Sequence, residues 1–454
     1  MKIFDLVGVG FGPANLALAI ALHEEVEIKQ YRDLKTVFLE AKPEFMWHPG
    51  LLLEDMSIQV SFLKDLATLR NPCSRFTFLN YLKEEGRLDS FINLQNFFPT
   101  RLELNDYFRW AANQFKHQVC YGKKVVALLP LSLSDKDTID AIEVVFRDLS
   151  SGQTESYVSQ NLVVATGGRP KMPEGISIQS NGAVFHSSEF LHCIHRQYPN
   201  QDFPYRFVVV GSGQSGAEIL YYLANHYPKA KVTGTIRGFG YRPMDDSNFV
   251  NEIFFPQEVD AFYSFSDTDR AQFLKDYHNS NYSVVDLSLI RQIYALLYKQ
   301  KIKGDDRIKI LSFLQLDNVS ETAGEVTAQF TQLMQKQVIN IECDALILAT
   351  GYDHSNQHPI LERLSPYLVK DQAGDYCLKR NYCLKSHPNF LPNIFLQGLC
   401  EKTHGFSDTL LSILPIRASE IVDSLLPTPA FPNLQASNSN DRLPVKHLVR
   451  QSLV

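Results

Sequence analysis

The sequence of 454 residues lacks a long apolar run. Near its start the longest such run covers residues 16–22, far short of the ~20 residues that a membrane-spanning helix needs. No cationic stretch precedes this run, which argues against a secretory signal. With 23 glycines and 22 prolines the chain is too poor in both for a fibrous protein, and at 44% hydrophobic residues it is too apolar for a disordered one. We therefore expect a folded, cytoplasmic protein without a membrane span.

The sequence also has few cysteines and no excess of positive charge. The seven cysteines are scattered from Cys73 to Cys400, as expected for reduced thiols rather than a disulfide framework. No CxxC or CxxxxC motif occurs, and five residues separate the nearest pair, Cys377 and Cys383, so the redox pair of a flavin disulfide reductase is missing. A formal net charge of -6 provides no field for holding nucleic acid. We expect neither a nucleic-acid partner nor a metal site.

One motif occurs twice, in distant parts of the chain. Each copy joins a short apolar run, typical of a buried parallel strand, to a glycine turn and then to a helical pattern. One glycine of such a turn permits a tight bend, another lets the backbone approach a pyrophosphate, and the helix N-terminus offers free N–H groups to the phosphates. The candidate residues are Gly8, Gly10, Gly12 and Pro13 in the first turn and Gly211, Gly213, Gln214, Ser215 and Gly216 in the second.

The residue that follows the next strand differs between the two units and predicts two different ligands. Glu40 follows the apolar run 37–39, where a carboxylate can bind a ribose diol. Arg237 follows the run 232–236, where a cation suits the 2′-phosphate of NADPH. Each alone could be a solvated charge at a strand end, but their matching positions favour FAD in the first unit and NADPH in the second.

Two further apolar runs, 161–167 and 344–351, both end on Ala-Thr-Gly. In flavoenzymes with two dinucleotide sites, the chain crosses between domains at such strands. We therefore predict an α/β fold with two Rossmann-like domains, one for FAD and one for NADPH, and a small helical substrate domain. The predicted boundaries are 1–168 and 352–426 for a discontinuous FAD domain, 169–244 and 304–351 for the NADPH domain, 245–303 for a helical substrate-binding insertion, and 427–454 for a flexible tail.

Several short segments resemble those of a known family. The most specific are residues 47–50 (WHPG), 59–66 (QVSFLKDL) and 404–412 (HGFSDTLLS). On these, the chain resembles the flavin-dependent N-hydroxylating monooxygenases of siderophore biosynthesis, the L-lysine/L-ornithine N-monooxygenase family, over residues 5–424. The segments that bring it nearer to the bacterial ornithine hydroxylases are 10–13, 69–72, 279–286 and 407–411.

The resemblance implies roles for individual residues. Lys64 matches a lysine that binds the amino-acid carboxylate, and Asn251 matches an asparagine that contacts the backbone-type groups of the substrate. Asn281 matches an asparagine near the nicotinamide and the substrate side chain, and Gln59 a glutamine lining the flavin site; these two are the candidate catalytic residues. The remaining matches are Trp47, His48 and Pro49 beside the flavin, Arg237 at NADPH, and Ser407, Thr409 and Leu410 in a segment that closes the FAD and substrate sites.

Each of these residues also has an ordinary alternative role. An isolated lysine such as Lys64 is more often a solvated surface charge, although its apolar neighbours make burial of its stem plausible. Asn251 and Asn281 could be helix caps or turn residues, which is the commoner use of asparagine. Trp47 could belong to the core. The site therefore depends on the family resemblance rather than on any single residue.

The family reaction is the NADPH- and FAD-dependent hydroxylation of a terminal primary amine through a C4a-hydroperoxyflavin formed with dioxygen. The amine must be neutral to react, yet with a pKa near ~10.4 only about one molecule in a thousand is neutral at pH 7. A desolvated pocket lined by neutral amides such as Asn281 lowers that pKa. L-Ornithine, with a carboxylate for Lys64, is the expected substrate, for hydroxamate siderophore synthesis. Putrescine, which lacks the carboxylate, and L-lysine, which needs a longer pocket, remain alternatives.

Other protein classes share parts of this pattern. A Baeyer–Villiger or sulfur-oxidising monooxygenase would share both dinucleotide units and, loosely, residues 185–190, but the longer glycine-aromatic fingerprint of those enzymes is missing here. A non-catalytic nucleotide-sensing module would keep the glycine turns without oxidising an amine. The resemblance to the N-monooxygenases also favours a homo-oligomer, specifically a tetramer.

Overall fold

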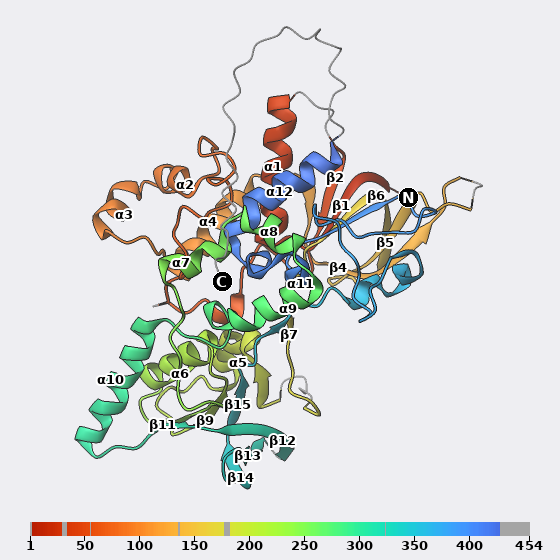
Figure 1. The fold of residues 1–454 in the computed structure, drawn as a ribbon. Coiled ribbons are helices and arrows are strands. Elements are labelled where there is room, and N and C mark those ends of the chain that lie inside the picture. The colour runs from red at the N-terminus through yellow and green to blue at the C-terminus, as the bar shows by residue number, and fades with distance from the viewer. Residues whose placement is uncertain are drawn as a thin grey trace, which may run out of the picture.

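The computed structural model describes most of the chain, and the tail predicted for residues 427–454 lies outside the described residues. The described ranges are 2–29, 34–54, 56–134, 137–176, 182–322 and 324–426. Two bodies, each built around parallel strands, lie one above the other in Figure 1. In the described ranges no helix is long and apolar enough to cross a bilayer. The α/β class predicted from the sequence is confirmed.

The upper body contains a seven-stranded sheet of order β3-β2-β1-β6-β5-β4, with β17 paired to β6. Its strands are β1 (Lys2–Val9), β2 (Thr36–Leu39), β3 (Val119–Cys120), β4 (Lys123–Leu131), β5 (Ala141–Asp148), β6 (Thr154–Val164) and β17 (Asn393–Leu396). Val7, Leu162 and Ile394 pair across β1, β6 and β17, which run parallel, and all three are buried. Strands far apart in sequence thus complete one sheet covered on both faces, as continuous apolar runs require.

Two helices, one from each end of the described chain, pack against each other over this sheet. They are α1 (Pro13–Lys29) and α12 (Leu414–Leu425), side by side in Figure 1. Leu16, Ile20 and Ile421 share their core with strand residues. Three further helices, α2 (Phe78–Glu84), α3 (Leu88–Leu94) and α4 (Arg101–Asn113), extend this core with buried aromatic rings such as Tyr107.

The lower body contains a five-stranded, fully parallel sheet of order β11-β10-β9-β15-β8. Its strands are β8 (Val184–His186), β9 (Arg206–Val210), β10 (Lys231–Thr235), β11 (Ile308–Leu311) and β15 (Ala345–Leu348), and its main helices are α5 (Phe190–Gln197) and α6 (Gln214–His226). An antiparallel sheet of β12 (Leu314–Thr322), β13 (Glu325–Gln332) and β14 (Gln337–Cys343) adjoins it. No pattern in the sequence predicted this second sheet.

The chain passes between the two bodies at two short strands, β7 (Arg169–Pro170) and β16 (Tyr352–Asp353). These strands pair antiparallel with each other, and an ion pair joins Arg169 to Asp353 at 2.5 Å. Strand β16 begins directly after one Ala-Thr-Gly segment, and β7 begins one residue after the other. The two passages therefore lie next to each other.

The residues expected to form one helical insertion, 245–303, divide between two packing environments. They form α7 (Asn248–Asn251), α8 (Glu258–Ser264), α9 (Asp267–Asp276) and α10 (Leu287–Lys303). Helices α8 and α9 contact the short helix α11 (Glu401–His404) of the upper body, whereas α10 contacts α6. Leu289 and Ile293 of α10 belong to the core of the lower sheet. The helical character is present, but α10 packs as part of the lower body.

Candidate functional site

The first glycine turn connects β1 to α1. Gly10 has φ +84°, and a Cβ there would lie 2.5 Å from the carbonyl oxygen of Ala165, so a side chain does not fit. A Cβ on Gly12 would meet nothing within 4 Å, so space is left for a ligand beside the backbone at the helix N-terminus. Pro13 is the first residue of α1, a position that tolerates proline, and Gly8 lies in β1 against the ring of Phe38.

Glu40 lies against this turn. One carboxylate oxygen accepts a hydrogen bond from the Phe11 N–H at 2.6 Å, and the other accepts from the Lys42 N–H at 2.8 Å. Each oxygen keeps a second lone pair, so the carboxylate can still accept from a ribose hydroxyl. The structure therefore places the expected ribose carboxylate at the first glycine turn.

The second glycine turn repeats this arrangement between β9 and α6. Gly211 has φ +145°, and a Cβ there would lie 2.2 Å from the carbonyl oxygen of Ala349. A Cβ on Gly216 would lie 2.6 Å from the carbonyl oxygen of Gly211, so the helix can approach the strand only if both residues are glycine. Ala349 donates its N–H to Val210 at 2.8 Å. Gly213 precedes α6 as its cap residue, and Ser215 in its first turn is half-buried.

The side chain of Gln214 is engaged with protein rather than open to a cofactor. Its Nε2 donates to Glu218 at 2.8 Å, and its Oε1 accepts from the Asp286 N–H at 2.8 Å. Glu218 is fully buried and forms an ion pair at 2.8 Å with Arg101 of α4, in the other body. Burial raises the pKa of Glu218, and Arg101 opposes that rise. Gln214 thus belongs to a contact between the two bodies.

Arg237 lies directly beyond β10, on the same side of the sheet as the second glycine turn. Its side chain is exposed, and in the described part of the chain it forms no ion pair. Parallel strands direct their carboxyl ends to one edge, where nucleotides bind in such sheets. Arg237 is therefore available for an anionic group at that edge.

His48 borders the crossing between the bodies, with its ring 6.1 Å from that of Tyr352 in β16. Trp47 donates its main-chain N–H to Asn105 at 2.9 Å and packs its ring 5.5 Å from Phe108, so the ring also belongs to the core. His48 has φ +47° and an exposed side chain. Pro49 begins the short helix η1 (Pro49–Leu51). Buried Nε2 of Gln59 has no acceptor among the described residues.

Lys64 is a half-buried ammonium group without a carboxylate partner in the described ranges. Desolvation lowers its pKa. The carboxylate next to it in sequence, Asp65, instead accepts from the N–H groups of Ala67, Thr68 and Phe78 at 2.6–2.9 Å. A partly desolvated cation without a counter-ion is suited to binding an anion.

Asn251 and Asn281 each lie next to residues that contact the segment 406–409. Nδ2 of Asn251 donates to the Asp246 carbonyl at 3.0 Å, and its Oδ1 has no partner among the residues that the structure describes. The turn after α7, η4 (Glu252–Phe254), contacts η7 (Phe406–Thr409), which contains buried Ser407 and half-buried Thr409 and precedes Leu410. Tyr282, next to Asn281, packs its ring 6.1 Å from that of Phe406. Gln59 and Lys64 lie on a different segment of the upper body.

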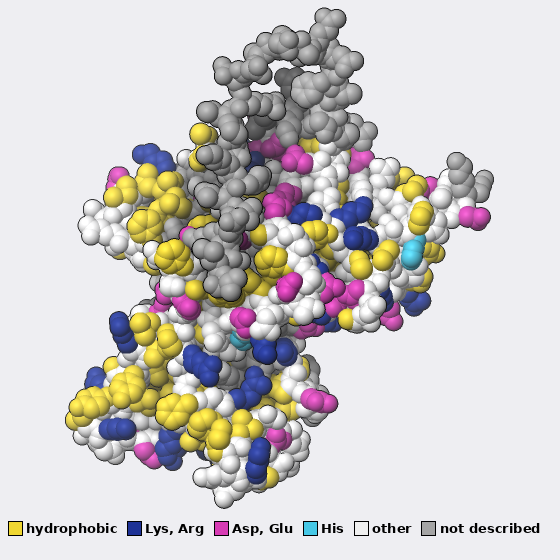
Figure 2. All heavy atoms as spheres, in the orientation of Figure 1, with side chains coloured by type: hydrophobic (Ala, Val, Ile, Leu, Met, Phe, Trp, Pro, Cys, Tyr) yellow, Lys and Arg dark blue, Asp and Glu magenta, His cyan; other side chains and the backbone are white. Residues whose placement is uncertain are grey.

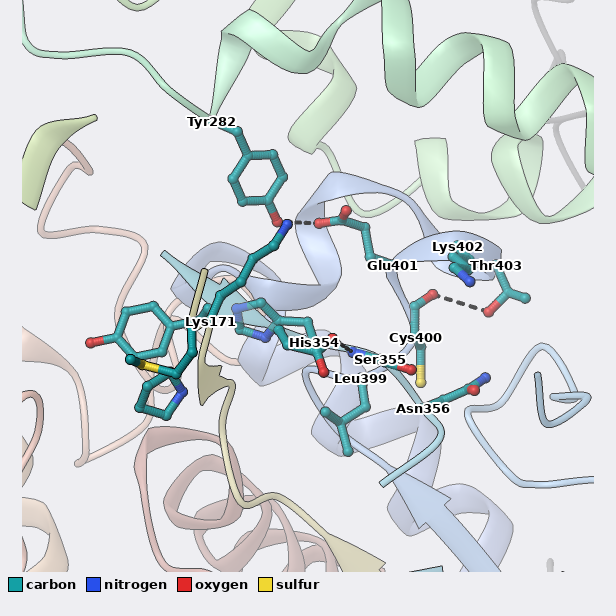
Figure 3. A pocket seen from close by; sticks show the side chains of 14 residues that line it. Lys171, Tyr282, His354, Ser355, Asn356, Leu399, Cys400, Glu401, Lys402 and Thr403 are labelled. Atoms are coloured by element: carbon teal, nitrogen blue, oxygen red, sulfur yellow. Dashed lines mark hydrogen bonds between the residues drawn. The ribbon is translucent and has the colours of Figure 1, made fainter. Parts of the chain in front are cut away.

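A cleft of about 550 Å³ opens beside this group, between β7 and β16 on one side and residues 399–403 on the other. Figure 3 shows Tyr282 and Glu401 meeting at its edge, where the Tyr282 hydroxyl donates to the Glu401 carboxyl. The same hydroxyl lies 3.4 Å from Oγ1 of Thr409. The pKa of Glu401 is raised to about 7, chiefly by burial and also by Asp408, while the Tyr282 hydrogen bond opposes the rise. Sequence reasoning missed both residues, since no motif relates positions so far apart.

Glu401→Gln is expected to make thermal stability depend less on pH. Because the folded-state pKa of Glu401 lies above its unfolded value, its contribution is complete below about pH 4.3 and is lost as the pH rises through about 7. The amide still accepts from Tyr282. The Tm of the variant relative to the parent protein should therefore rise between about pH 5 and about pH 8, measured by thermal unfolding. Glu362→Gln, on an exposed residue, is the control, and a pH-independent difference for Glu401→Gln would contradict the expectation.

A sequence model described as L-lysine 6-monooxygenase/L-ornithine 5-monooxygenase matches residues 2–354. The chain belongs to this family. The L-ornithine N(5)-monooxygenase of Burkholderia cepacia is 41% identical over 406 residues, 89% of this chain and 90% of the relative. The ornithine N-hydroxylase of Kutzneria sp. 744, solved with reduced FAD, NADP⁺ and L-ornithine, has a TM-score of 0.87 at 36% identity, covering 93% of this chain and 99% of that one. The FAD-bound cadaverine monooxygenase of Erwinia amylovora has a TM-score of 0.80 at 27% identity, covering 98% and 100%.

Membership of the lysine/ornithine monooxygenase family confirms the predicted enzyme class, Rossmann-like fold and cofactors, FAD and NADPH. The residues present fit both dinucleotides. The first glycine turn leaves open space at Gly12, and Gln59 offers a buried donor that lacks an acceptor within the described ranges. The second turn combines a glycine cradle with the unpaired Arg237. The same ranges contain no group of three or more His, Cys, Asp or Glu side chains able to hold a metal ion.

Proposed function

We propose that this flavin N-monooxygenase hydroxylates the terminal amine of L-ornithine for the synthesis of a hydroxamate siderophore. The proposal is carried by the observation that Lys64 is half-buried and has no carboxylate partner in the described ranges. Such a cation suits a substrate with a free carboxylate. The names of the ornithine-hydroxylating relatives support the same substrate.

We propose roles for the site residues in this reaction. Gly10, Gly12 and Glu40 hold FAD, and Gly211 and Arg237 hold NADPH. When bound, the flavin takes up hydride from NADPH and activates dioxygen, so that one oxygen atom reaches the amine. The chain's task is to orient the amine and keep it neutral.

The lining proposed for the amine site suits a neutral amine. Lys64 binds the carboxylate at the far end and so fixes how far the amine reaches. Neutral amides from Asn251 and Asn281, with Gln59 at the flavin, line the site without stabilising an ammonium ion as a carboxylate would. Ser407, Thr409 and Leu410 close the site from the C-terminal segment and exclude water.

Lys64→Ala is expected to raise KM for L-ornithine about 10- to 100-fold, because a hydrogen bond to a charged group contributes roughly 1.5–3 kcal/mol. NADPH oxidation without amine should change little, since neither dinucleotide contacts this lysine in the proposed arrangement. The measurement is steady-state kinetics of hydroxylamine formation against ornithine concentration. Lys83→Ala, on an exposed lysine of α2, is the matched control. Equal loss of the amine-dependent and amine-independent rates would remove Lys64 from the carboxylate site.

The substrate is tested by supplying purified FAD-loaded protein with NADPH and one amine at a time. The amines are L-ornithine, L-lysine, putrescine and cadaverine, and both hydroxylamine and NADPH consumption are followed. The similarity to a cadaverine monooxygenase makes the diamines the specific alternative. A higher kcat/KM for putrescine would assign a diamine substrate, and no hydroxylamine from any amine would refute N-hydroxylation.

We further propose the division of the chain into domains 1–168 plus 352–426 for FAD and 169–244 plus 287–351 for NADPH. Residues 245–286 form the substrate-side insertion, since α10 packs on the lower sheet.

We propose that the protein acts in the cytoplasm as a homo-tetramer. Its support is the family resemblance together with an exposed apolar face of α10, made of Tyr294, Tyr298 and Ile302 at 62–72% exposure. Figure 2 shows hydrophobic side chains gathered over this helix. Light scattering on the FAD-loaded protein measures the assembly, and a monomer at micromolar concentration would contradict it.

A further inference from the structure

An unbroken chain of buried hydrogen bonds runs from the first glycine turn to the segment 406–409. It begins at the Gly10 carbonyl, which accepts from Nδ2 of Asn15 at 2.6 Å. Oδ1 of Asn15 then accepts from Nε2 of Gln397 at 2.9 Å. Oε1 of Gln397 in turn accepts from Nε of Arg417 at 3.2 Å. The bonds connect the start of α1, the residue after β17, and α12.

Arg417 completes the connection with a buried ion pair. Its Nη1 donates to the Asp408 carboxylate at 2.7 Å and to the Asp408 carbonyl at 2.6 Å. The second carboxylate oxygen of Asp408 accepts from the Cys400 N–H at 2.6 Å, next to Glu401 of the cleft. Arg417 and Asp408 are each 1% exposed. Such a pair needs every partner in place, because a charge left unpaired in the interior is strongly unfavourable.

The position of this network distinguishes it from general core packing. One end fixes the carbonyl of Gly10, the residue whose Cβ would collide with Ala165. The other end fixes Asp408, which stands between Ser407 and Thr409 in η7. Buried polar networks with all members satisfied specify one arrangement of the elements that they join. This network therefore fixes the flavin turn relative to the segment that meets Tyr282.

We infer that Arg417, acting through Gln397 and Asn15, is a positioning residue that holds segment 406–409 in register with the first glycine turn. FAD binding at the turn and amine binding beside the segment then depend on each other. The effect on amine binding rests on the proposed function. The effect on FAD binding depends on the first glycine turn and not on which amine is the substrate.

Gln397→Glu is the decisive variant, because it keeps an acceptor for Arg417 while a carboxylate oxygen replaces the donor to Asn15. Gln397→Leu removes both bonds. For each, the Kd for FAD is measured by titrating flavin into flavin-free protein, with and without saturating L-ornithine. In the parent protein ornithine should tighten FAD binding, and by linkage the same factor applies in reverse. In both variants the Kd for FAD without amine should rise about tenfold, as expected for a lost buried hydrogen bond. The ratio of the Kd for FAD without ornithine to that with ornithine should fall toward one.

Arg380→Met is the matched control. Arg380 pairs with Glu420 of α12 at 2.8 Å and with Asp260 of α8 at 2.6 Å, so it anchors the same helix away from the glycine turn. Its FAD affinity and ornithine effect should equal those of the parent protein. A lowered Tm in Gln397→Glu with unchanged FAD affinity would overturn the inference, as would equal changes in Arg380→Met. If the parent protein hydroxylates no amine, the proposed function fails, and FAD affinity without amine still decides the inference.

Discussion

Gly10→Ala is expected to yield protein that loses FAD on gel filtration. Gly211→Ala should retain FAD, but NADPH should reduce that flavin more slowly than in the parent protein. Each added methyl would lie 2.2–2.5 Å from the carbonyl oxygen of an alanine, Ala165 or Ala349, at the end of a neighbouring strand. Both backbones also have positive φ, which costs a residue with a side chain about 1–3 kcal/mol. The turn must shift, and the N–H groups that face the pyrophosphate shift with it.

Flavin content and the rate of flavin reduction under anaerobic conditions measure the two effects separately. Gly122→Ala is the matched control: its φ is +68°, and an added Cβ would meet nothing within 4 Å. It reproduces the backbone strain without the collision. Gly211→Ala with an unchanged KM for NADPH, or Gly10→Ala with full flavin content, would show that the close carbonyl approach is not needed.

Arg101→Met is expected to destabilise the FAD-loaded protein by about 3–5 kcal/mol, because it leaves the fully buried Glu218 carboxylate without its cation. The burial that raises the pKa of Glu218 is then opposed by the Gln214 hydrogen bond but no longer by a cation, so the loss should increase as the pH rises. For a body of this size such a loss lowers Tm by roughly 10 °C, measurable by thermal unfolding. KM for NADPH should rise as well, since Glu218 holds Gln214 in the second glycine turn.

Combining Arg101→Met with Glu218→Leu removes both charges and should recover most of the lost Tm, because a buried ion pair can be replaced by apolar side chains with little loss. Lys229→Met breaks a pair whose members, Lys229 and Asp202, are 62% and 73% exposed, and it should leave Tm nearly unchanged. A double variant as unstable as Arg101→Met alone would contradict the unpaired-charge explanation.

The glycine turns and the strands around them could be predicted from the sequence because their signals are local. A short apolar run, a glycine and a helical pattern each follow from the residues themselves, and the two Ala-Thr-Gly segments do lie against the turns, with the carbonyls of Ala165 and Ala349 facing Gly10 and Gly211. The family membership followed from three short segments and is confirmed by comparison.

The side-chain partners could not be predicted, because they join residues far apart in sequence. The position of Gln214 in the motif predicts a cofactor contact, yet its side-chain amide is hydrogen-bonded to Glu218 and to the Asp286 N–H. Glu401 and Tyr282 meet because α11 packs against α9, and the residues that follow α9 bring Tyr282 to Glu401. The packing of α10 on the lower sheet was missed because an amphipathic pattern gives the buried face of a helix but not the element that it covers.

The adjacent strands β7 and β16 have a consequence for how such a protein can fold and change over time. The two ends of residues 169–353 are held together by the pairing of these strands, which form a two-stranded neck. When the ends of an inserted segment are held together, the entropic cost of closing the interrupted body depends little on the length of the insertion. Each sheet can then form around its own core, and the inserted body can be exchanged or enlarged without rethreading the other.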